Sequence, residues 1–449
     1  MPVIRPLANP ALVLAGALAL TGCSGSEAAI PDHPTWHNAE VNAVSRTASA
    51  AGVAATTSLK PDGTLETVAL DLATGRKLWS HPATMAGRLP GMGVPAPAIV
   101  ETAPGQAVAV AVDPTRQGRW NATLVGRDAR TGERRWSRPV HSTFGPQRCG
   151  RLVCVSEHTA LTGARVSVLD PATGETRWKL SGIAEVEWSD DSRAVFLRLA
   201  RHPVLEARDL KNGEVAWRLP VEQALGAGVD LSGGWSFGAT ASNLIGYVAP
   251  YTNPKTGRVS AFGLFSVKLA DGTVNWMRPS VVRVYPSGSP AFAPVVRPVD
   301  QQGRYGGFAR LDAESGRVLG QIPVTQVPEA GWWLAFPSRM EKLGFLRHGK
   351  PGDAFDLATG RSAEVKNERG WSFCVTDPKP LPLKDQTPGF YSVASLCEFR
   401  LADGARVSGS GAPPTWFTGS HGGWRIWRDE KGGLHGIKDG AGTAPGMYG

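Results

Sequence analysis

The stretch VLDPATGETRW at residues 168–178 decides the fold, because close copies of it recur along most of the chain. Four further copies end in tryptophan: ALDLATGRKLW (69–79), GRDARTGERRW (126–136), ARDLKNGEVAW (207–217) and VKLADGTVNW (267–276). Three weaker copies are ARLDAESGRVLG (309–320), AFDLATGRSAE (354–364) and EFRLADGARVS (398–408). Their central glycines stand at 75, 132, 174, 213, 272, 316, 360 and 404, which gives a mean spacing of 47 residues. A period of this length indicates a repeat architecture.

Each conserved position of the repeat has a physical task. Glycine allows the positive φ that a tight turn between two strands needs, and an Asp four residues earlier can accept N–H groups from that turn. A Trp four residues after the glycine predicts one recurring packing environment, most simply a wedge between neighbouring units. The predicted docking residues are Asp71, Gly75 and Trp79; Asp128, Gly132 and Trp136; Asp170, Gly174 and Trp178; Asp209, Gly213 and Trp217; and Gly272 and Trp276.

The segments between the repeats indicate an all-β protein. Runs such as AVAVAVD (107–113) and LVCVSE (152–157) are apolar or alternating and end at Gly, Pro or Asp, while helical periodicity is missing. A hydrophobic fraction of 42% with 15 Trp in 449 residues argues for a packed protein and excludes disorder and collagen. About four short strands in roughly 45 residues is the size of one propeller blade.

The repeat resembles the tryptophan-docking motif of propellers of the pyrroloquinoline-quinone type, over Leu70 to about Gly440. The chain is closest in size and setting to the propeller lipoproteins of the outer-membrane assembly machinery. The resemblance implies one β-propeller over residues 35–449 with eight four-stranded blades, and it leaves seven or nine blades open. It also implies that N- and C-terminal strands share one blade, in which Trp36 would be the docking residue.

The N-terminus predicts export and lipid attachment. Residues 1–22 carry one charge, Arg5, before an apolar stretch over 7–20, which is too short for a membrane span and is typical of a signal peptide. The sequence LTGC ending at Cys23 resembles a bacterial lipobox, so we expect Cys23 to carry the lipid and residues 23–34 to form a flexible tether. The alternative is an ordinary secretory signal with a chance cysteine. We expect a cell-membrane location facing away from the cytoplasm.

Four other cysteines suit disulfides in an exported chain. Local pairs, Cys149 with Cys154 and Cys374 with Cys397, are favoured, and free buried thiols are the alternative. Neither pair has a partner pair at zinc-site spacing, so we expect no metal.

Charge and motifs argue against several classes of function. The net charge of +9 is spread along the chain without a basic block, so no nucleic-acid partner is expected. Gly91-Met92-Gly93 continues into Pro95 and is a chance match to a phosphate loop. The pair Asp190-Asp191 is most simply a solvated turn. The quinone-dependent enzymes of the resembled family hold their cofactor with adjacent cysteines and calcium, and no two cysteines here are adjacent.

The leading hypothesis is therefore a monomeric, non-enzymatic envelope lipoprotein without a cofactor that binds a protein partner. A sensor for small molecules or glycans is the alternative, and a quinone-dependent dehydrogenase is the third hypothesis. The aromatic residues Trp332, Trp333, Trp416, Phe417, Trp424 and Trp427 suggest a stacking platform or, more often, core packing.

Overall fold

The structure is a computed structural model of the 449-residue chain. It describes residues 35–85, 94–115, 120–141, 143, 145–159, 163–285, 295–300, 302 and 304–326, and then 332–337, 342–347, 350–356, 361–362, 369–375, 379–381, 389–391, 394–400, 416–421, 423–428 and 432–438. The signal peptide, Cys23 and the tether predicted from the sequence lie outside these residues, as do Gly91 to Gly93, Gly360 and Gly404.

The described chain is all-β, built mainly of antiparallel four-stranded sheets, as the sequence predicts. Six of these sheets follow one another along the chain. Sheet 1 contains β2 (Ala48–Ala50), β3 (Val53–Leu59), β4 (Leu65–Asp71) and β5 (Lys77–Ala83), and sheet 2 contains β6 (Ala98–Ala103), β7 (Gln106–Asp113), β8 (Asn121–Asp128) and β9 (Arg134–His141). Sheet 3 contains β10 (Pro146–Cys149), β11 (Leu152–Thr159), β12 (Gly163–Leu169) and β13 (Thr176–Ser181). Sheet 4 contains β14 (Ala184–Ser189), β15 (Arg193–Arg198), β16 (Val204–Asp209) and β17 (Val215–Pro220). Sheet 5 contains β18 (Trp235–Ala239), β19 (Asn243–Val248), β20 (Gly263–Lys268) and β21 (Val274–Pro279), and sheet 6 contains β22 (Val281–Tyr285), β23 (Val295–Pro298), β24 (Phe308–Leu311) and β25 (Val318–Ile322).

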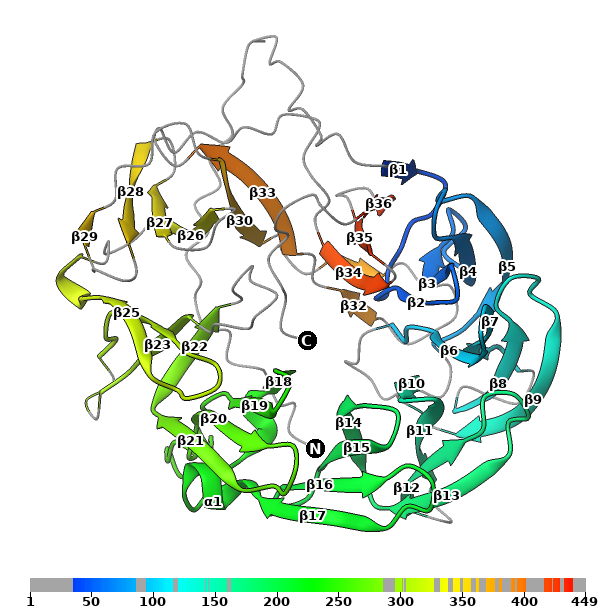
Figure 1. Cartoon of the computed structure of the whole chain (residues 1–449), viewed down its shortest axis with the longest axis horizontal. Coiled ribbons are helices and arrows are strands. Elements are labelled where there is room, and N and C mark those ends of the chain that lie inside the picture. The colour runs from blue at the N-terminus through cyan, green and yellow to red at the C-terminus, as the bar shows by residue number, and fades with distance from the viewer. Residues whose placement is uncertain are drawn as a thin grey trace, which may run out of the picture.

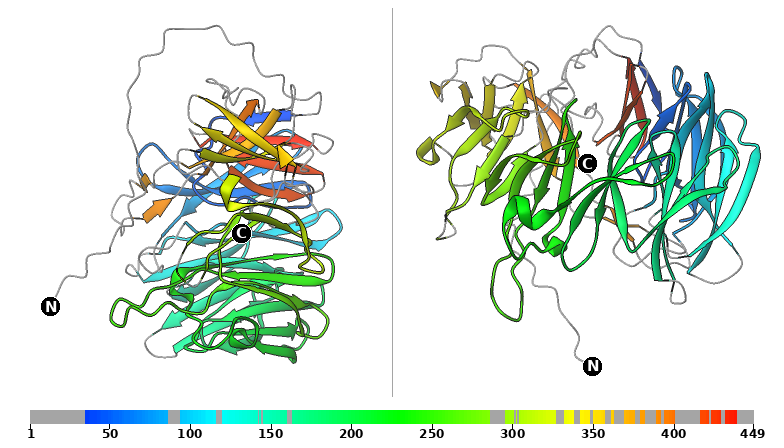
Figure 2. Two further views of the ribbon diagram at one scale, coloured as in Figure 1. Left: turned by 90° about the vertical axis from the view of Figure 1, so that its left-hand side faces the viewer. Right: turned by 60° about the horizontal axis from the view of Figure 1, so that its bottom comes forward.

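These sheets stand side by side around a central axis (Figure 1). The first strand of each sheet lies nearest the axis, and the fourth strand forms the outer rim. Figure 2 shows the same arrangement of sheets from two further sides. All seven residues of the second strand β3 are buried, whereas most residues of the rim strand β9 are exposed. Apolar side chains from facing sheets therefore fill the space between neighbours.

The two ends of the chain meet in a seventh four-stranded sheet, the terminal sheet. Its order is β1 (Thr35–Asn38), β36 (Leu434–Lys438), β35 (Trp424–Arg428) and β34 (Trp416–His421). Strand β1 pairs antiparallel with β36, and Trp36 lies opposite Gly436. This pairing brings the start of the described chain beside its end.

The last repeats lie in a six-stranded sheet. Its order is β29 (Arg361–Ser362), β28 (Lys350–Asp356), β27 (Lys342–Arg347), β26 (Trp332–Pro337), β30 (Arg369–Val375) and β33 (Ala394–Arg400). A two-stranded sheet pairs β31 (Lys379–Leu381) with β32 (Gly389–Tyr391). Because two weak repeats contribute strands to one sheet here, the number of eight blades and the closed ring stay predictions.

Helix is nearly absent from the described residues. It comprises α1 (Val221–Leu225) and the 3-10 turns η1 (Leu231–Gly233) and η2 (Val324–Gln326). No helix of this described part is long and apolar enough to cross a membrane.

An insertion in sheet 5 explains why 59 residues separate Gly213 from Gly272. Helix α1 and η1 fill the connection between β17 and β18, and a long hairpin joins β19 to β20. Parallel bridging of Val229 with Ala261 ties the two segments together. In Figure 2 the light-green hairpin projects beyond the sheets. The additional residues between Gly213 and Gly272 therefore lie in connections outside the four strands of the sheet.

Candidate functional site

The turn of each repeat has one geometry from sheet 1 to sheet 6. The glycine N–H donates to the carbonyl oxygen four residues earlier, as Gly75 does to Asp71 at 2.8 Å and Gly316 to Asp312 at 2.8 Å. The six glycines have φ between 66° and 76°, a region that disfavours side chains with a Cβ atom. The weak copy around Gly316 thus has the same turn as the other five copies, although Gly320 stands in place of the tryptophan.

The recurring aspartates accept hydrogen bonds within the turn. The Oδ1 atom of Asp170 accepts the N–H groups of Ala172 and Thr173 at 2.8 and 3.3 Å. Partial burial opposes ionisation of Asp170, but bonds from Arg177 and from two backbone N–H groups outweigh it and hold its pKa below the usual value. These carboxylates are held apart in separate sheets, one in each turn.

Each docking tryptophan lies against the turn of the next sheet. Its Nε1–H donates to the carbonyl oxygen three residues before the next glycine, while its ring covers that glycine. The six bonds run from Trp36 to Leu72 (2.8 Å), Trp79 to Ala129 (2.8 Å), Trp136 to Pro171 (2.7 Å), Trp178 to Leu210 (2.9 Å), Trp217 to Leu269 (3.0 Å) and Trp276 to Ala313 (3.2 Å). A Cβ atom on Gly213 would lie 2.7 Å from the Trp178 ring, so the turn glycine also makes room for the indole.

A β-bulge precedes the docking indole in each of sheets 1 to 5, and the same bulge precedes Gly320 in sheet 6. In sheet 4 the register shifts between Ala207 and Arg208, which leaves Ala216 unpaired beside Trp217. The same shift occurs in the third and fourth strands of the other five sheets. Since a bulge re-aims the following side chain, it directs the indole toward the next sheet.

A second contact between sheets comes from the residue two positions after the tryptophan, and the sequence analysis missed it. Asn38 donates to the carbonyl of Gly75 at 2.8 Å, Arg278 donates to that of Gly316 at 2.6 Å, and the His81 ring lies 3.1 Å from the Gly132 carbonyl oxygen. The three side chains differ in type but share a position. A search for polar residues at that offset would have found it.

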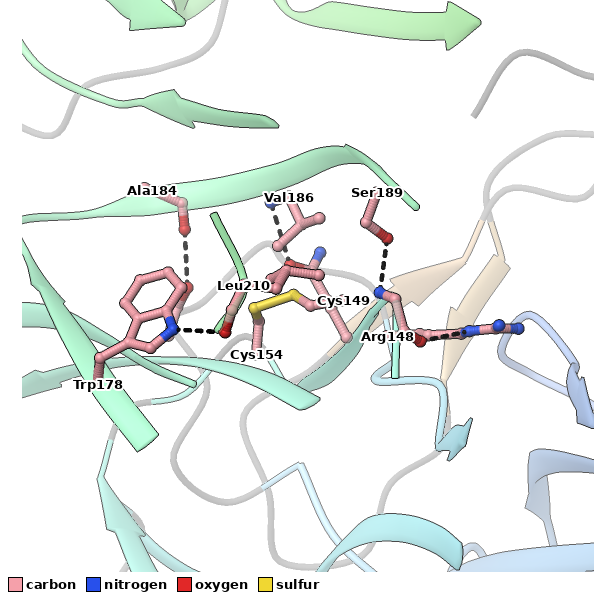
Figure 3. Close-up of a disulfide and its surroundings, with 11 residues drawn as sticks. Arg148, Cys149, Cys154, Trp178, Ala184, Val186, Ser189 and Leu210 are labelled. Atoms are coloured by element: carbon pink, nitrogen blue, oxygen red, sulfur yellow. Dashed lines mark hydrogen bonds between the residues drawn. A yellow bond between two sulfur atoms is a disulfide. The ribbon is translucent and has the colours of Figure 1, made fainter. Parts of the chain in front are cut away.

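Cys149 and Cys154 form a disulfide at the contact between sheets 3 and 4 (Figure 3). Both cysteines are buried in a core cluster with Phe196 and Leu210. The turn they enclose is anchored to sheet 4 because Gly150 N–H donates to Ser189 Oγ at 2.9 Å. Cys374 and Cys397 lie on the paired strands β30 and β33, opposite Ser395 and Ser372. A bond between that second pair stays a prediction.

Removing the disulfide is expected to lower the stability of the fold. The free energy of unfolding should fall by about 2 kcal/mol in the double variant Cys149→Ala and Cys154→Ala, because the unfolded chain regains the entropy that closing this short loop removes. Urea unfolding of wild type and variant measures the difference. Dithiothreitol should shift the wild-type midpoint by more than that of the variant, which keeps Cys374 and Cys397, and a reductant-insensitive wild type would contradict the expectation.

Side chains from three neighbouring inner strands meet near the axis, in what we call the axial cluster: Gln147, Glu185, Glu187 and Trp235. Trp235 Nε1–H of β18 donates to Glu187 Oε1 at 3.0 Å, and Val186 N–H of β14 donates to Gln147 Oε1 of β10 at 3.3 Å. The register of β14 shifts between Val186 and Trp188, so Glu187 is the extra residue of a bulge. This bulge directs a carboxyl group toward the neighbouring sheet.

The carboxyl group of Glu187 titrates near neutrality. Desolvation by burial and the nearby charge of Glu185 raise its pKa to about 7, and the hydrogen bond from Trp235 only partly opposes this. A carboxyl that exchanges its proton near pH 7 beside an indole can bind a cationic group or donate to a hydroxyl. Sequence patterns gave no signal for this cluster.

Other candidate residues occupy structural positions. Asp190 caps a turn through bonds from Ser192 and Arg193, and Asp191 pairs with Arg151 at 3.0 Å. Trp424 is buried in the core beside Trp36, which excludes it from an exposed stacking platform. Within the described residues no three His, Cys, Asp or Glu side chains gather in a way that could hold a metal ion.

Comparison with known proteins adds a family match. Residues 32–180 match the family model described as "Outer membrane protein assembly factor BamB". No curated protein matches the chain.

Several solved structures resemble the chain at low identity. BamB from Moraxella catarrhalis is 13% identical with a TM-score of 0.42, covering 89% of this chain and 97% of its own. Sqt1 from Saccharomyces cerevisiae is 10% identical with a TM-score of 0.44, covering 93% of this chain and 100% of its own. The quinohemoprotein alcohol dehydrogenase ADHIIG from Pseudomonas putida HK5 is 12% identical with a TM-score of 0.40, covering 92% and 77%. Values this low carry no argument about function.

The similarity to that family rests on the repeats and on the match to the family model. Successive turns with one geometry, each covered by the indole of the preceding sheet, are what the motif requires. Together with the match over residues 32–180, they support the similarity of this chain to the pyrroloquinoline-quinone-like propeller repeat family.

Proposed function

We propose that this chain is a non-enzymatic scaffold lipoprotein of the bacterial envelope, built as a closed ring of eight blades, that binds a protein partner. The observation that carries the proposal is the match of residues 32–180 to an outer membrane assembly factor. Pairing of β1 with β36 supports the closed ring. Lipid attachment at Cys23 would hold the ring at the membrane surface, facing away from the cytoplasm.

The contacts between sheets give a physical reason for this role. Six indoles each bond to the next sheet, and polar side chains two positions later add further bonds. A framework fixed in this way presents its rim and loops in one arrangement. Less conformational entropy is then lost when a partner binds.

Affinity purification after crosslinking tests the scaffold. The full chain is crosslinked in cells, purified from detergent-solubilised membranes and examined for proteins that accompany it in fixed ratio. A defined envelope protein is expected. A chain that purifies alone would contradict the proposal, and a Cys23→Ala variant that stays in the membrane fraction would contradict the lipid anchor.

The axial cluster favours a second candidate, a sensor for a cationic or hydroxyl-bearing small molecule. Its support is Glu187, which lies beside Trp235 and titrates near neutrality. A thermal-shift panel of glycans and amines, run with wild type and Glu187→Gln, tests it. Stabilisation that the variant loses would favour the sensor.

The non-enzymatic part of the proposal has its own test. The cysteine arrangement does not fit a quinone site of the resembled enzymes, because the disulfide joins residues five positions apart instead of adjacent ones. Addition of the quinone with calcium is expected to leave the melting temperature unchanged. A clear stabilisation would favour a dehydrogenase.

A further inference from the structure

Three arginines surround one buried carboxylate in sheet 4, and we call this group the arginine cluster: Glu206, Arg198, Arg208 and Arg218. The Glu206 side chain is only 1% exposed. Its Oε2 accepts Arg218 Nε at 2.6 Å, its Oε1 accepts Arg208 Nε, and Arg198 Nη1 lies 3.7 Å away. The cluster spans β15, β16 and β17, the last of which is the rim strand.

The charge of this cluster is unbalanced. Burial opposes ionisation of Glu206, but the bonds from Arg218 and Arg208 outweigh it and hold its pKa below the usual value. Glu206 is therefore negative at neutral pH and neutralises one of the three arginines. In sheets 2 and 3 the ion pairs between second and third strands, Arg127 with Asp113 and Arg165 with Glu157, have one arginine for each acid. Among these three groups, only the arginine cluster has two more arginines than acids.

Of the three arginines, Arg218 is the one whose positive charge is most exposed to solvent. Arg208 Nη1 donates a further hydrogen bond to the Gly213 carbonyl at 2.5 Å, and Arg198 Nη2 donates one to the Ser181 carbonyl at 2.6 Å. Arg218 Nη1 and Nη2 have no acceptor among the described residues, and the side chain is 57% exposed. A guanidinium that is held through Nε on a half-exposed side chain keeps its two Nη groups for bidentate recognition of a carboxylate.

An exposed apolar side chain lies on the same face of sheet 4. The bulge at Ala216 places Val215 opposite Arg208 in the register, so Val215 shares the face of the arginine cluster. Val215 is 39% exposed. The exposed guanidinium of Arg218 and the exposed side chain of Val215 on one rim strand could together bind a short peptide of acidic and apolar residues.

We propose that Arg218, supported by Arg208 and Arg198, binds the carboxylate of an acidic peptide segment on a protein partner, with Val215 contacting the neighbouring side chain. This rests on the proposed scaffold function and names the chemistry of its partner. An anionic lipid surface fits less well, because attraction to lipid needs several exposed cations, whereas the Arg208 and Arg198 side chains are only 14% and 26% exposed.

Direct binding to the purified full chain tests the site. The probe is a fluorescein-labelled peptide of alternating Glu and Leu, followed by anisotropy, with a Gln-for-Glu peptide as the ligand control. Arg218→Gln should raise the Kd at least about tenfold, because it removes the charge-assisted hydrogen bonds of the bidentate contact. The Kd of Arg218→Lys should lie between those of wild type and Arg218→Gln. The matched control Arg151→Gln removes another exposed arginine and should stay within about twofold.

Three outcomes would overturn the site. Equal loss in Arg218→Gln and Arg151→Gln would mean attraction by net charge, and equal binding by the Glu and Gln peptides would exclude carboxylate recognition. Absence of peptide binding, together with Arg218-dependent binding to phosphatidylglycerol vesicles, would assign the arginine to a membrane. If Arg218→Gln has a lowered melting temperature, Arg218→Lys keeps the positive charge beside Glu206 and tests the bidentate guanidinium contact alone. The peptide assay uses a synthetic ligand and the purified chain. A negative peptide result therefore leaves the crosslinking test of the scaffold valid, and a chain that purifies alone after crosslinking leaves the peptide assay valid.

Discussion

Replacing Trp217 by alanine is expected to destabilise the protein by about 3 to 5 kcal/mol. The indole is buried against Gly272 and belongs to the core cluster shared by sheets 4 and 5. Its removal leaves a cavity between two sheets and also leaves the Leu269 carbonyl without its 3.0 Å bond. Loss of packing and loss of the bond act together, so the effect should exceed that of replacing an exposed residue on the same strand.

Urea unfolding separates these two contributions. Trp217→Phe keeps most of the buried area but loses the N–H, so it should cost about 1 kcal/mol. Val215→Ala, on the same strand but partly exposed, is the control and should cost less than about 1 kcal/mol. If Trp217→Ala unfolds at the same urea concentration as Val215→Ala, the indole does not hold the sheets together.

The protein should become less stable as the pH rises from about 4.5 to 7, through Glu187. Its folded pKa of about 7 lies above the usual value of 4.5, because of burial and the charge of Glu185. Above pH 4.5 the unfolded chain releases this proton while the folded chain retains it, so folding loses free energy until the folded carboxyl also ionises. The loss is at most about 3 kcal/mol, and it is complete above pH 7.

Comparison of wild type with Glu187→Gln isolates this carboxyl from all others. The variant should gain stability relative to wild type by up to about 3 kcal/mol between pH 4 and pH 8. Glu133→Gln, on an exposed turn, should show no such pH-dependent gain. A difference between wild type and Glu187→Gln that stays constant over this range would mean that Glu187 ionises normally.

The sequence predicts the regular part of this molecule well. The repeat locates the turn glycines and the tryptophans along the chain, and the apolar runs locate strands such as β7 and β11. These signals are local, because a turn with positive φ and a buried strand each impose their own residue types. The all-β class is confirmed for the same reason.

The sequence does not predict the features that depend on pairing between distant residues. Glu187 is an ordinary acidic residue in a strand until the bulge in β14 directs it toward Trp235 of the next sheet. Arg218 similarly differs from other exposed arginines only because Glu206 and two more arginines lie beside it. Tertiary contacts of this kind leave no period in the sequence, so only the fold reveals them.

The pairing of β1 with β36 has a consequence for biosynthesis. Strand β1 ends at Asn38, and its partner begins at Leu434, so the ribosome must add almost the whole protein before the two can meet. At roughly 5 to 20 residues per second, this delay lasts on the order of 20 to 80 s. During that interval the hydrogen-bonding edge of β1 has no native partner, which makes the nascent chain a natural client for a chaperone.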